Sequence, residues 1–216
     1  MTTVLELGDV RLTRVLYVDA SIDPSAAGLT ADEVRGVPWG EPTWADDGMV
    51  RAASCVWLIS TGGRHIAVDP SGNIDDILHE PNSTQAHQRA YTAAFAAAGV
   101  PIESIDTVLL SHIESIGLGA VRDGDGWRPF FPNARLLICD RAQQEFEQAR
   151  PDGELGEAIQ ALVDAGLVDT FADGDELAPG VVAEWTGMHN PGHCAFHVRG
   201  TEQTATFVGH LAVSPL

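Results

Sequence analysis

The chain has 216 residues, of which 44% are hydrophobic, and this is enough for one globular domain with a substantial core. Its 31 acidic and 12 basic residues give a formal net charge of −19. Such a charge repels phosphate backbones and anionic lipids, which argues against nucleic-acid and membrane partners. The acids are scattered along the chain, so they favour solubility rather than a charged tail.

The cysteines and the N-terminal sequence bear on the compartment. The first twenty residues lack the basic segment and apolar core of a secretion signal, and no stretch reaches membrane-spanning length. Cys55, Cys139 and Cys194 are widely spaced and form no CxxC pair, which favours a reducing compartment over a disulfide framework. We therefore expect a cytoplasmic protein of one domain, residues 1–216, with Cys55 and Cys139 in its core.

The first third of the sequence predicts two hairpins separated by a long loop. Residues 3–18 alternate between apolar and polar side chains and turn near Gly8 and Asp9. Residues 55–70 form a second pair of β-rich runs around a glycine turn. Residues 19–47 are rich in proline and show little periodicity, so we expect an irregular excursion over the surface and a candidate lid.

The rest of the chain alternates helices with buried strands and then returns to strands. Residues 82–101 have a capping residue, apolar side chains at helical spacing and a Gly–Pro stop, which predicts a helix. Short, nearly continuous apolar runs at 105–112 and 134–140 are typical of strands covered on both faces. Helical patterns then cover 141–150 and 153–168, and strand patterns cover 180–188, 195–200 and 204–210. This order predicts an α/β protein of the segregated, α+β kind, with two packed sheets and helices outside.

Histidines near the ends of the predicted strands suggest a metal site. His112 ends one buried strand and Glu114 follows two residues later; in extended backbone these side chains point to the same side and can converge on one ion. His193 follows a Pro–Gly turn, and His210 ends the last strand. Imidazoles with a carboxylate form a known zinc or iron ligand set that leaves positions for water. The sequence therefore predicts a metal site made of His112, Glu114, His193 and His210.

The other histidines have simpler interpretations. His189, just before the Pro–Gly turn, and His197, within a predicted strand, are intermediate cases. Cys194 lies beside His193 and suggests a thiolate nucleophile, but sequence neighbours seldom present both groups to one point. Three isolated histidines are expected to be ordinary surface or core residues: His65, His79 and His87.

Five segments, taken in order, carry a family resemblance. They are "GGRHIAVDPSGN", in which a strand ends in an aspartate before a glycine-containing loop, then "IESIDTVLLSH", "FPNARLLIC", "NPGHCAFH" and "TFVGH". In this order they resemble the metallo-β-lactamase superfamily, and within it the N-acyl-homoserine-lactone lactonases and related ester or organophosphate hydrolases, with their HxHxDH, PGHTPGH and FxGD motifs. The resemblance covers nearly the whole chain. It implies an αββα sandwich with the site at the edge where the two sheets meet.

The resemblance also implies which metal ligands are lost. Laid on this sequence, the HxHxDH motif falls on His112, Glu114, Ile116 and Gly117. Ile116 and Gly117 offer no ligand atoms, so a centre with two metal ions should not form. The metal-binding histidine of PGHTPGH falls on His193, and the aspartate that bridges two ions falls on His210. Three imidazoles and one carboxylate therefore remain for a single ion.

Two functions follow from this reading. The first is a mononuclear metallohydrolase of a small ester or lactone, with weak or redirected activity, one divalent ion (zinc for preference), and Glu114 and His210 as candidate catalytic residues. The alternative is a metal-free protein of the same fold. It would be either a pseudoenzyme that binds a small ligand in the cleft or a catalyst that uses Glu114 and histidines as acid and base.

The end of the sequence bears on partners. It stops at "LAVSPL" soon after the predicted site strand, whereas the family resemblance implies a further strand and helix. Without these elements a sheet edge would be open. Either the protein is a shortened form, or a neighbouring subunit covers the edge. We therefore expect a small-molecule substrate or ligand as partner, with a homo-oligomer as a second expectation.

Overall fold

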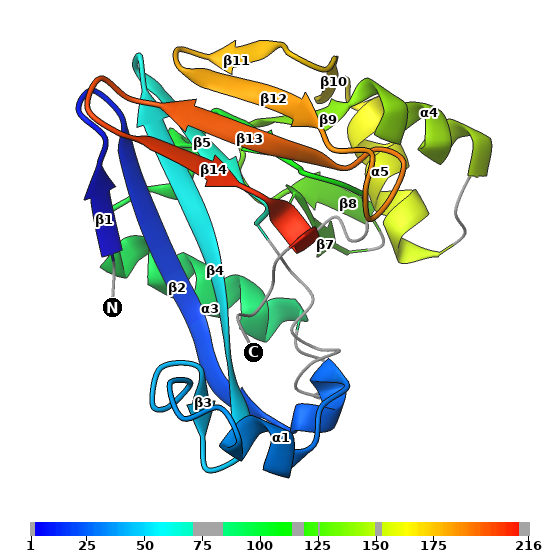
Figure 1. Cartoon of the computed structure of the whole chain (residues 1–216). Coiled ribbons are helices and arrows are strands. Elements are labelled where there is room, and N and C mark those ends of the chain that lie inside the picture. The colour runs from blue at the N-terminus through cyan, green and yellow to red at the C-terminus, as the bar shows by residue number, and fades with distance from the viewer. Residues whose placement is uncertain (1–2, 71–83, 114–118, 125, 150–152, 212–216) are drawn as a thin grey trace.

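The structure is a computed structural model that describes residues 3–70, 84–113, 119–124, 126–149 and 153–211. These residues form an eight-stranded sheet, a four-stranded sheet and a two-stranded hairpin (Figure 1). The α-helices among them are α1 (Ala31–Arg35), α3 (Thr84–Ala97), α4 (Asp140–Ala149) and α5 (Glu154–Asp164). Short 3-10 turns are η1 (Pro24–Ala27), η2 (Ile102–Ser104) and η4 (Gly209–Leu211). Within the described ranges, no helix is long and apolar enough to cross a membrane.

The larger sheet has an antiparallel part and a parallel part. Its order is β1-β2-β4-β5-β6-β9-β10, and β3 pairs with β4. The first four strands of this order pair antiparallel, whereas β5, β6, β9 and β10 run parallel. The strands are β1 (Thr3–Glu6), β2 (Arg11–Ile22), β3 (Ala45–Asp46), β4 (Met49–Thr61), β5 (Arg64–Val68), β6 (Thr107–Leu109), β9 (Arg135–Cys139) and β10 (Val168–Phe171). Both predicted hairpins and both predicted buried strands are present in this sheet.

The smaller sheet is an antiparallel meander of order β11-β12-β13-β14. Its strands are β11 (Glu176–Ala178), β12 (Val181–Trp185), β13 (Cys194–Arg199) and β14 (Thr204–Phe207). The separate hairpin consists of β7 (Ala120–Asp123) and β8 (Gly126–Pro129). The strand patterns at 180–188, 195–200 and 204–210 thus correspond to β12, β13 and β14, whereas the hairpin was not predicted.

Two hydrophobic clusters occupy the opposite faces of the larger sheet. On one face, Val108 packs in a cluster with Tyr91 of α3 and Ile159 of α5. On the other face, the next residue, Leu109, packs with Phe196 of the smaller sheet. Consecutive strand residues point to opposite faces, and both faces are buried here, which explains the unbroken apolar run in the sequence. Helices, larger sheet and smaller sheet therefore form successive layers, and this arrangement confirms the predicted α+β fold class.

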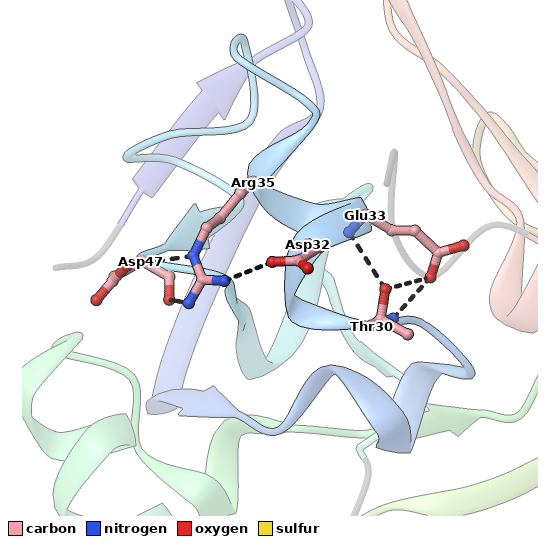
Figure 2. Close-up of polar contacts among 5 residues, drawn as sticks. All are labelled: Thr30, Asp32, Glu33, Arg35 and Asp47. Carbon is pink, nitrogen blue, oxygen red and sulfur yellow. Dashed lines mark hydrogen bonds and ion pairs between the residues drawn. The ribbon is translucent and has the colours of Figure 1, made fainter.

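The segment expected to be an irregular loop contains short elements of its own. β2 and β4 extend beyond the smaller sheet and carry α1 and β3 at their far end (Figure 1). Figure 2 shows a capping box: the Glu33 amide donates to Thr30 Oγ1 at 3.3 Å, and the Thr30 amide donates to the Glu33 carboxylate at 2.8 Å. Arg35 at the end of α1 pairs with Asp47 beyond β3 at 3.4 Å. Residues 19–47 are therefore more ordered than predicted, and their role as a lid stays a prediction.

Gly200 allows the turn between β13 and β14 to lie against the turn between β1 and β2. A Cβ at this position would lie 1.8 Å from the carbonyl oxygen of Leu7, and backbone cannot yield as a side-chain end can. We expect Gly200→Ala to lower the free energy of unfolding by about 2–4 kcal/mol, measured by urea unfolding. Gly126→Ala is the matched control, since its Cβ would meet nothing closer than 3.8 Å. Equal stability of the two variants would contradict the prediction.

Candidate metal centre

The ends of several strands from both sheets meet at one edge of the molecule. Val68 of β5 pairs with Leu109 of β6, so the carboxyl ends of these parallel strands coincide. In the smaller sheet, Trp185 at the end of β12 pairs with Cys194 at the start of β13. The Cys194 amide donates to the carbonyl oxygen of Ser111 at 2.7 Å, which joins the two sheets at this point. Residues that follow these strand ends are therefore placed close together, as in other sheet proteins that bind ligands at such edges.

Three imidazoles gather at this edge. His112 follows β6, His189 lies between β12 and β13, and His210 lies in η4 after β14. One possible ligand atom from each lies within 4.8 Å of the other two, and His112 is the least exposed of the three. The centroid of the His112 ring is 4.8 Å from that of His189 and 4.6 Å from that of His210. In the described part of the chain this is the one group with metal-ligand spacing.

The spacing fits one ion once the side chains draw closer together. Two nitrogen atoms that bind zinc tetrahedrally at about 2.1 Å lie about 3.4 Å apart, so a pair at 4.8 Å must close by about 1.4 Å. Rotation of exposed side chains is sufficient for a change of this size, and His189 and His210 are both exposed. The donor set is also suitable, because neutral imidazole binds zinc, copper, iron and nickel. The residues present therefore fit a divalent metal ion.

The ring of His112 is oriented by a short chain of hydrogen bonds. The Ser111 hydroxyl lies 2.8 Å from His112 Nδ1, and the Ser111 amide donates to the Asp69 carboxylate at 2.7 Å. With Nδ1 bonded to Ser111, His112 can bind an ion through Nε2 without losing this contact. Burial raises the pKa of the Asp69 carboxyl, while hydrogen bonds from Ser111 and the positive charge of protonated His112 and His210 oppose the rise.

The backbone conformation is unusual at two residues of this site. Asp69 has φ 41° and His189 has φ 64°, both in the left-handed region that favours glycine. Asp47 is the one other non-glycine residue with positive φ in the described ranges. Strained conformations persist where the surrounding structure imposes them, and they often mark functional positions. The positive φ of His189 therefore supports a functional role for this residue.

The loop that carries His189 is held by contacts at both ends. The Thr186 amide donates to the His193 carbonyl at 3.0 Å, and the His193 amide donates to Asn190 at 3.1 Å. Trp185 Nε1 donates to the carbonyl of Pro191 at 2.9 Å. These bonds close the loop between β12 and β13 into a compact turn. The position of His189 therefore depends on the residues of the whole loop.

His193 lies beside the three imidazoles but is fully buried. Its ring centroid is 5.3 Å from that of His112 and 5.5 Å from that of His189. Nδ1 lies 2.9 Å from the Thr186 hydroxyl, which in turn donates to the His193 carbonyl at 3.2 Å. A hydroxyl has a single proton, so this network assigns the Nδ1–H tautomer and leaves a lone pair on Nε2. That buried Nε2 has no hydrogen-bond partner.

The surroundings of His193 keep it neutral. Burial, followed by the positive charge that His112, His189 and His210 carry when protonated, lowers the pKa of His193 to about 4. Gly209 makes the packing possible, because a Cβ there would lie 2.6 Å from both His193 Nε2 and Ser111 Oγ. The glycine thus allows η4 to bring the neighbouring His210 to the site.

The structure places three of the four predicted site residues close together. His112 and His210 belong to the group of three imidazoles, and His193 lies next to them; their roles as ligands stay predictions. Glu114 falls outside the described residues, as do Ile116 and Gly117. The sequence also predicted that the strand would run to His112. β6 ends at Leu109, three residues earlier.

From the sequence, His189 was an intermediate case. The hydroxyls of Ser111 and Thr186 were not predicted to contact the site histidines. The signal for His189 was present, because it precedes His193 by four residues across an Asn–Pro–Gly turn that folds the chain back. His65 and His197 lie away from the cluster and bond Ser60 and Glu184, as ordinary histidines do. His79 and the side chain of His87 lie outside the described part.

Comparisons with known proteins agree with the fold. No family model matches the sequence, and no curated protein sequence matches it. Among solved structures, the chain is similar to the hydrolase AbOPH of the beta lactamase superfamily, with a TM-score of 0.72, 19% identity, and coverage of 97% of this chain and 73% of that one. It is also similar to a "probable metal-dependent hydrolase" from Staphylococcus aureus, with a TM-score of 0.65, 18% identity, and coverage of 95% and 74%.

A third similar structure is AidC, described as a dizinc quorum-quenching lactonase in complex with a product. Its TM-score is 0.66 at 17% identity, and the match covers 95% of this chain and 72% of AidC. These similarities reach nearly the full length of the chain, so they concern the whole arrangement of sheets and helices. The chain has the metallo-β-lactamase fold shared by hydrolases that include lactonases, as its sequence motifs predicted.

Proposed function

We propose that the chain is a hydrolase of small esters or lactones that uses one divalent metal ion, zinc for preference, held by His112, His189 and His210. The observation that carries the proposal is the convergence of these three imidazoles to within 4.8 Å from three different loops. Chance rarely places three such groups at the strand ends of two sheets, where functional residues concentrate. Glu114 and His193, predicted from the sequence, are proposed to complete or support the site.

A single ion is proposed rather than a pair. AidC is described as a dizinc enzyme, but the group found here contains three imidazoles and no carboxylate among the described residues. Two positions of the HxHxDH motif are occupied by Ile116 and Gly117, which have no ligand atoms. One ion is what these residues can hold. When bound, zinc would polarise a carbonyl oxygen and lower the pKa of a water molecule toward neutrality.

The net charge of the chain and the apolar residues near His189 and His210 favour an uncharged substrate with some apolar surface. The net charge of −19 disfavours the approach of anions. Three exposed apolar side chains lie within two residues of His189 or His210 in the sequence, with exposed fractions of 61%, 36% and 36%: Met188, Val208 and Leu211. Apolar walls with a few polar groups are typical of small-molecule sites. A neutral ester or lactone fits these surroundings better than a phosphorylated compound does.

The test compares metal-free and zinc-loaded protein. After removal of metal with a chelator, zinc is titrated back while binding, melting temperature and hydrolysis of a p-nitrophenyl ester and a simple lactone are followed. We expect one zinc ion per chain, a higher melting temperature because zinc binds the folded state, and hydrolysis that depends on zinc. Absence of zinc uptake would contradict the proposal and favour the metal-free alternative, a ligand-binding protein of the same fold.

The Ser111 hydroxyl gives a prediction about ligand orientation. Ser111→Ala removes the 2.8 Å contact to His112 Nδ1, and loss of such an outer partner lowers metal affinity about 10–100-fold. We expect a decrease of this size in zinc affinity, measured by competition with a chelating dye. Ser60→Ala is the matched control, because Ser60 makes the same kind of contact, at 3.0 Å, to His65 outside the site. If both variants bind zinc as the parent does, Ser111 has no such role.

A further inference from the structure

The loop that carries His189 lies against the first turn of α4 at two points. Arg141 of α4 lies over Trp185 at the end of β12, with its Cζ atom 3.8 Å from the ring centroid. At the other end of the loop, a Cβ at Gly192 would lie 2.4 Å from the Cβ of Ala142, so this part of the loop contacts the helix directly. α4 follows β9 of the larger sheet, whereas the loop belongs to the smaller sheet. These contacts therefore fix the loop relative to the larger sheet.

The indole of Trp185 contacts the loop on both sides of His189. Gly187 has φ 63°, and a Cβ there would lie 3.4 Å from two atoms of the indole ring, so the chain folds back over this ring. The indole Nε1 donates to the carbonyl of Pro191 at 2.9 Å. The backbone amide of Trp185 donates to the Asp173 carboxylate at 2.8 Å, which holds Trp185 itself in place. Trp185 thus supports the chain two residues before His189 and two residues after it.

His189 needs this support because its backbone conformation is unfavourable by itself. Its φ of 64° lies in the left-handed region, which costs free energy in a residue that has a Cβ. The side chain is exposed, so burial of the ring contributes little to holding this conformation. The contacts of the surrounding loop must therefore offset the cost, and those of Trp185 join the loop to the rest of the fold.

We propose that Trp185, stacked beneath Arg141, is the positioning residue for His189 and holds its imidazole near the other two before an ion binds. The inference rests on the proposed function, because Trp185 acts through a proposed metal ligand. Trp185 is not a ligand itself, since the indole nitrogen is a donor only. The apparent affinity of a site falls with the fraction of molecules in the binding conformation. Loss of the support from Trp185 should therefore weaken metal binding.

Four variants separate the contacts of Trp185. Trp185→Leu removes both the stack with Arg141 and the hydrogen bond to Pro191, and we expect zinc affinity to fall about tenfold, roughly threefold for each contact. Trp185→Phe keeps an aromatic ring but loses the indole N–H, and Arg141→Ala removes only the stack, so each should cost roughly threefold. Arg141→Lys keeps a cation over the ring and should restore part of the affinity. Competition with a chelating dye measures all four.

Trp127 provides the matched control. Arg122 lies over its ring, 4.6 Å from the centroid, and its Nε1 donates to the Glu157 carboxylate at 3.5 Å. Trp127 packs against the hydrophobic cluster on the helix-covered face of the larger sheet, whereas Trp185 packs against the cluster on the opposite face. Trp127→Leu removes the same two kinds of contact away from the metal centre. It should leave zinc affinity within about twofold of the unaltered protein, since distant sites act independently.

A second measurement follows the loop in metal-free protein. The Thr186 amide donates to the carbonyl of His193, and the His193 amide donates to the carbonyl of Asn190. Both amides should exchange slowly with solvent while the loop keeps its shape. Trp185→Leu should speed hydrogen–deuterium exchange in peptides that cover residues 186–193 and leave exchange in β4 and β6 unchanged. Unchanged exchange in those two strands also shows that the variant is folded.

Faster exchange in the loop together with weaker zinc binding supports the proposal. Faster exchange with unchanged zinc affinity would show a merely structural role and would overturn it, as would unchanged exchange or an equal loss of affinity in Trp127→Leu. If Trp185→Leu does not fold, Arg141→Ala decides by the same two measurements, because Arg141 is exposed. Zinc binding by the unaltered protein is measured first. Its absence would contradict the proposed function and this inference with it, whereas an adverse result in the variants contradicts this inference alone.

Discussion

His189→Ala is expected to lower zinc affinity by more than about 100-fold, because loss of an outer-shell partner alone costs about 10–100-fold and a direct ligand contributes more. His189 supplies one of the three possible ligand atoms that lie within 4.8 Å of one another, and two imidazoles cannot by themselves hold zinc firmly. Zinc content after gel filtration should fall to background, measured by elemental analysis. Zinc-dependent ester hydrolysis should fall with it.

His197→Ala is the control for this prediction. His197 is also a histidine of the smaller sheet, but it bonds Glu184 and Thr206 on the surface instead of the cluster. Its loss should change neither zinc content nor activity, since exposed ion pairs contribute little. If the two variants retain zinc equally, His189 is not a ligand, and a site built on His112, Glu114, His193 and His210, as the sequence suggested, becomes the better description.

Metal-free protein is expected to lose about 3 kcal/mol of unfolding free energy between pH 7 and pH 4 through His193 alone. Its pKa is about 4 in the folded chain and about 6.5 when unfolded. In this window the unfolded state binds a proton that the folded state does not, so stability falls as the pH falls. The contribution is present above pH 6.5 and is lost progressively toward pH 4.

His193→Asn isolates this contribution, since the other titrating groups remain. The Asp69 carboxyl has a raised pKa and so favours the folded state at lower pH, which is the opposite slope; a comparison of two proteins cancels it. Urea unfolding at a series of pH values, in the presence of chelator, gives both curves. The variant should show a shallower loss of stability below pH 6.5. Parallel curves would mean that His193 is not held neutral by its surroundings.

The fold could be predicted from local patterns where those patterns were strong. The period-two alternation of residues 3–18 and the apolar runs at 105–112 and 134–140 predicted β1, β2, β6 and β9, because burial of one or both faces leaves a direct trace in sequence. The hairpin of β7 and β8 was not predicted, since neither AVRD nor GWRP belongs to a longer alternating or apolar run. The short helix and strand within residues 19–47 were also not predicted, although the sequence contains the Thr-x-x-Glu pattern of a capping box at Thr30 and Glu33.

The site could be predicted only in outline. Strand ends indicated His112 and His210, because the loops that follow strands place functional side chains on a rigid scaffold. The position of His189 depends on how its loop folds back. Hydrogen bonds from Thr186 and Trp185 close this loop, and His189 itself has positive φ. No periodic sequence pattern predicts such a conformation. Compartment and self-association stay predictions from the sequence.

The most direct test of the proposed centre is a crystal structure of zinc-loaded protein with anomalous data collected on both sides of the zinc edge. The account predicts one anomalous peak per chain, about 2.1 Å from a ring nitrogen of each of His112, His189 and His210. A peak held by other residues, or no peak at this edge of the sheets despite full loading, would contradict it.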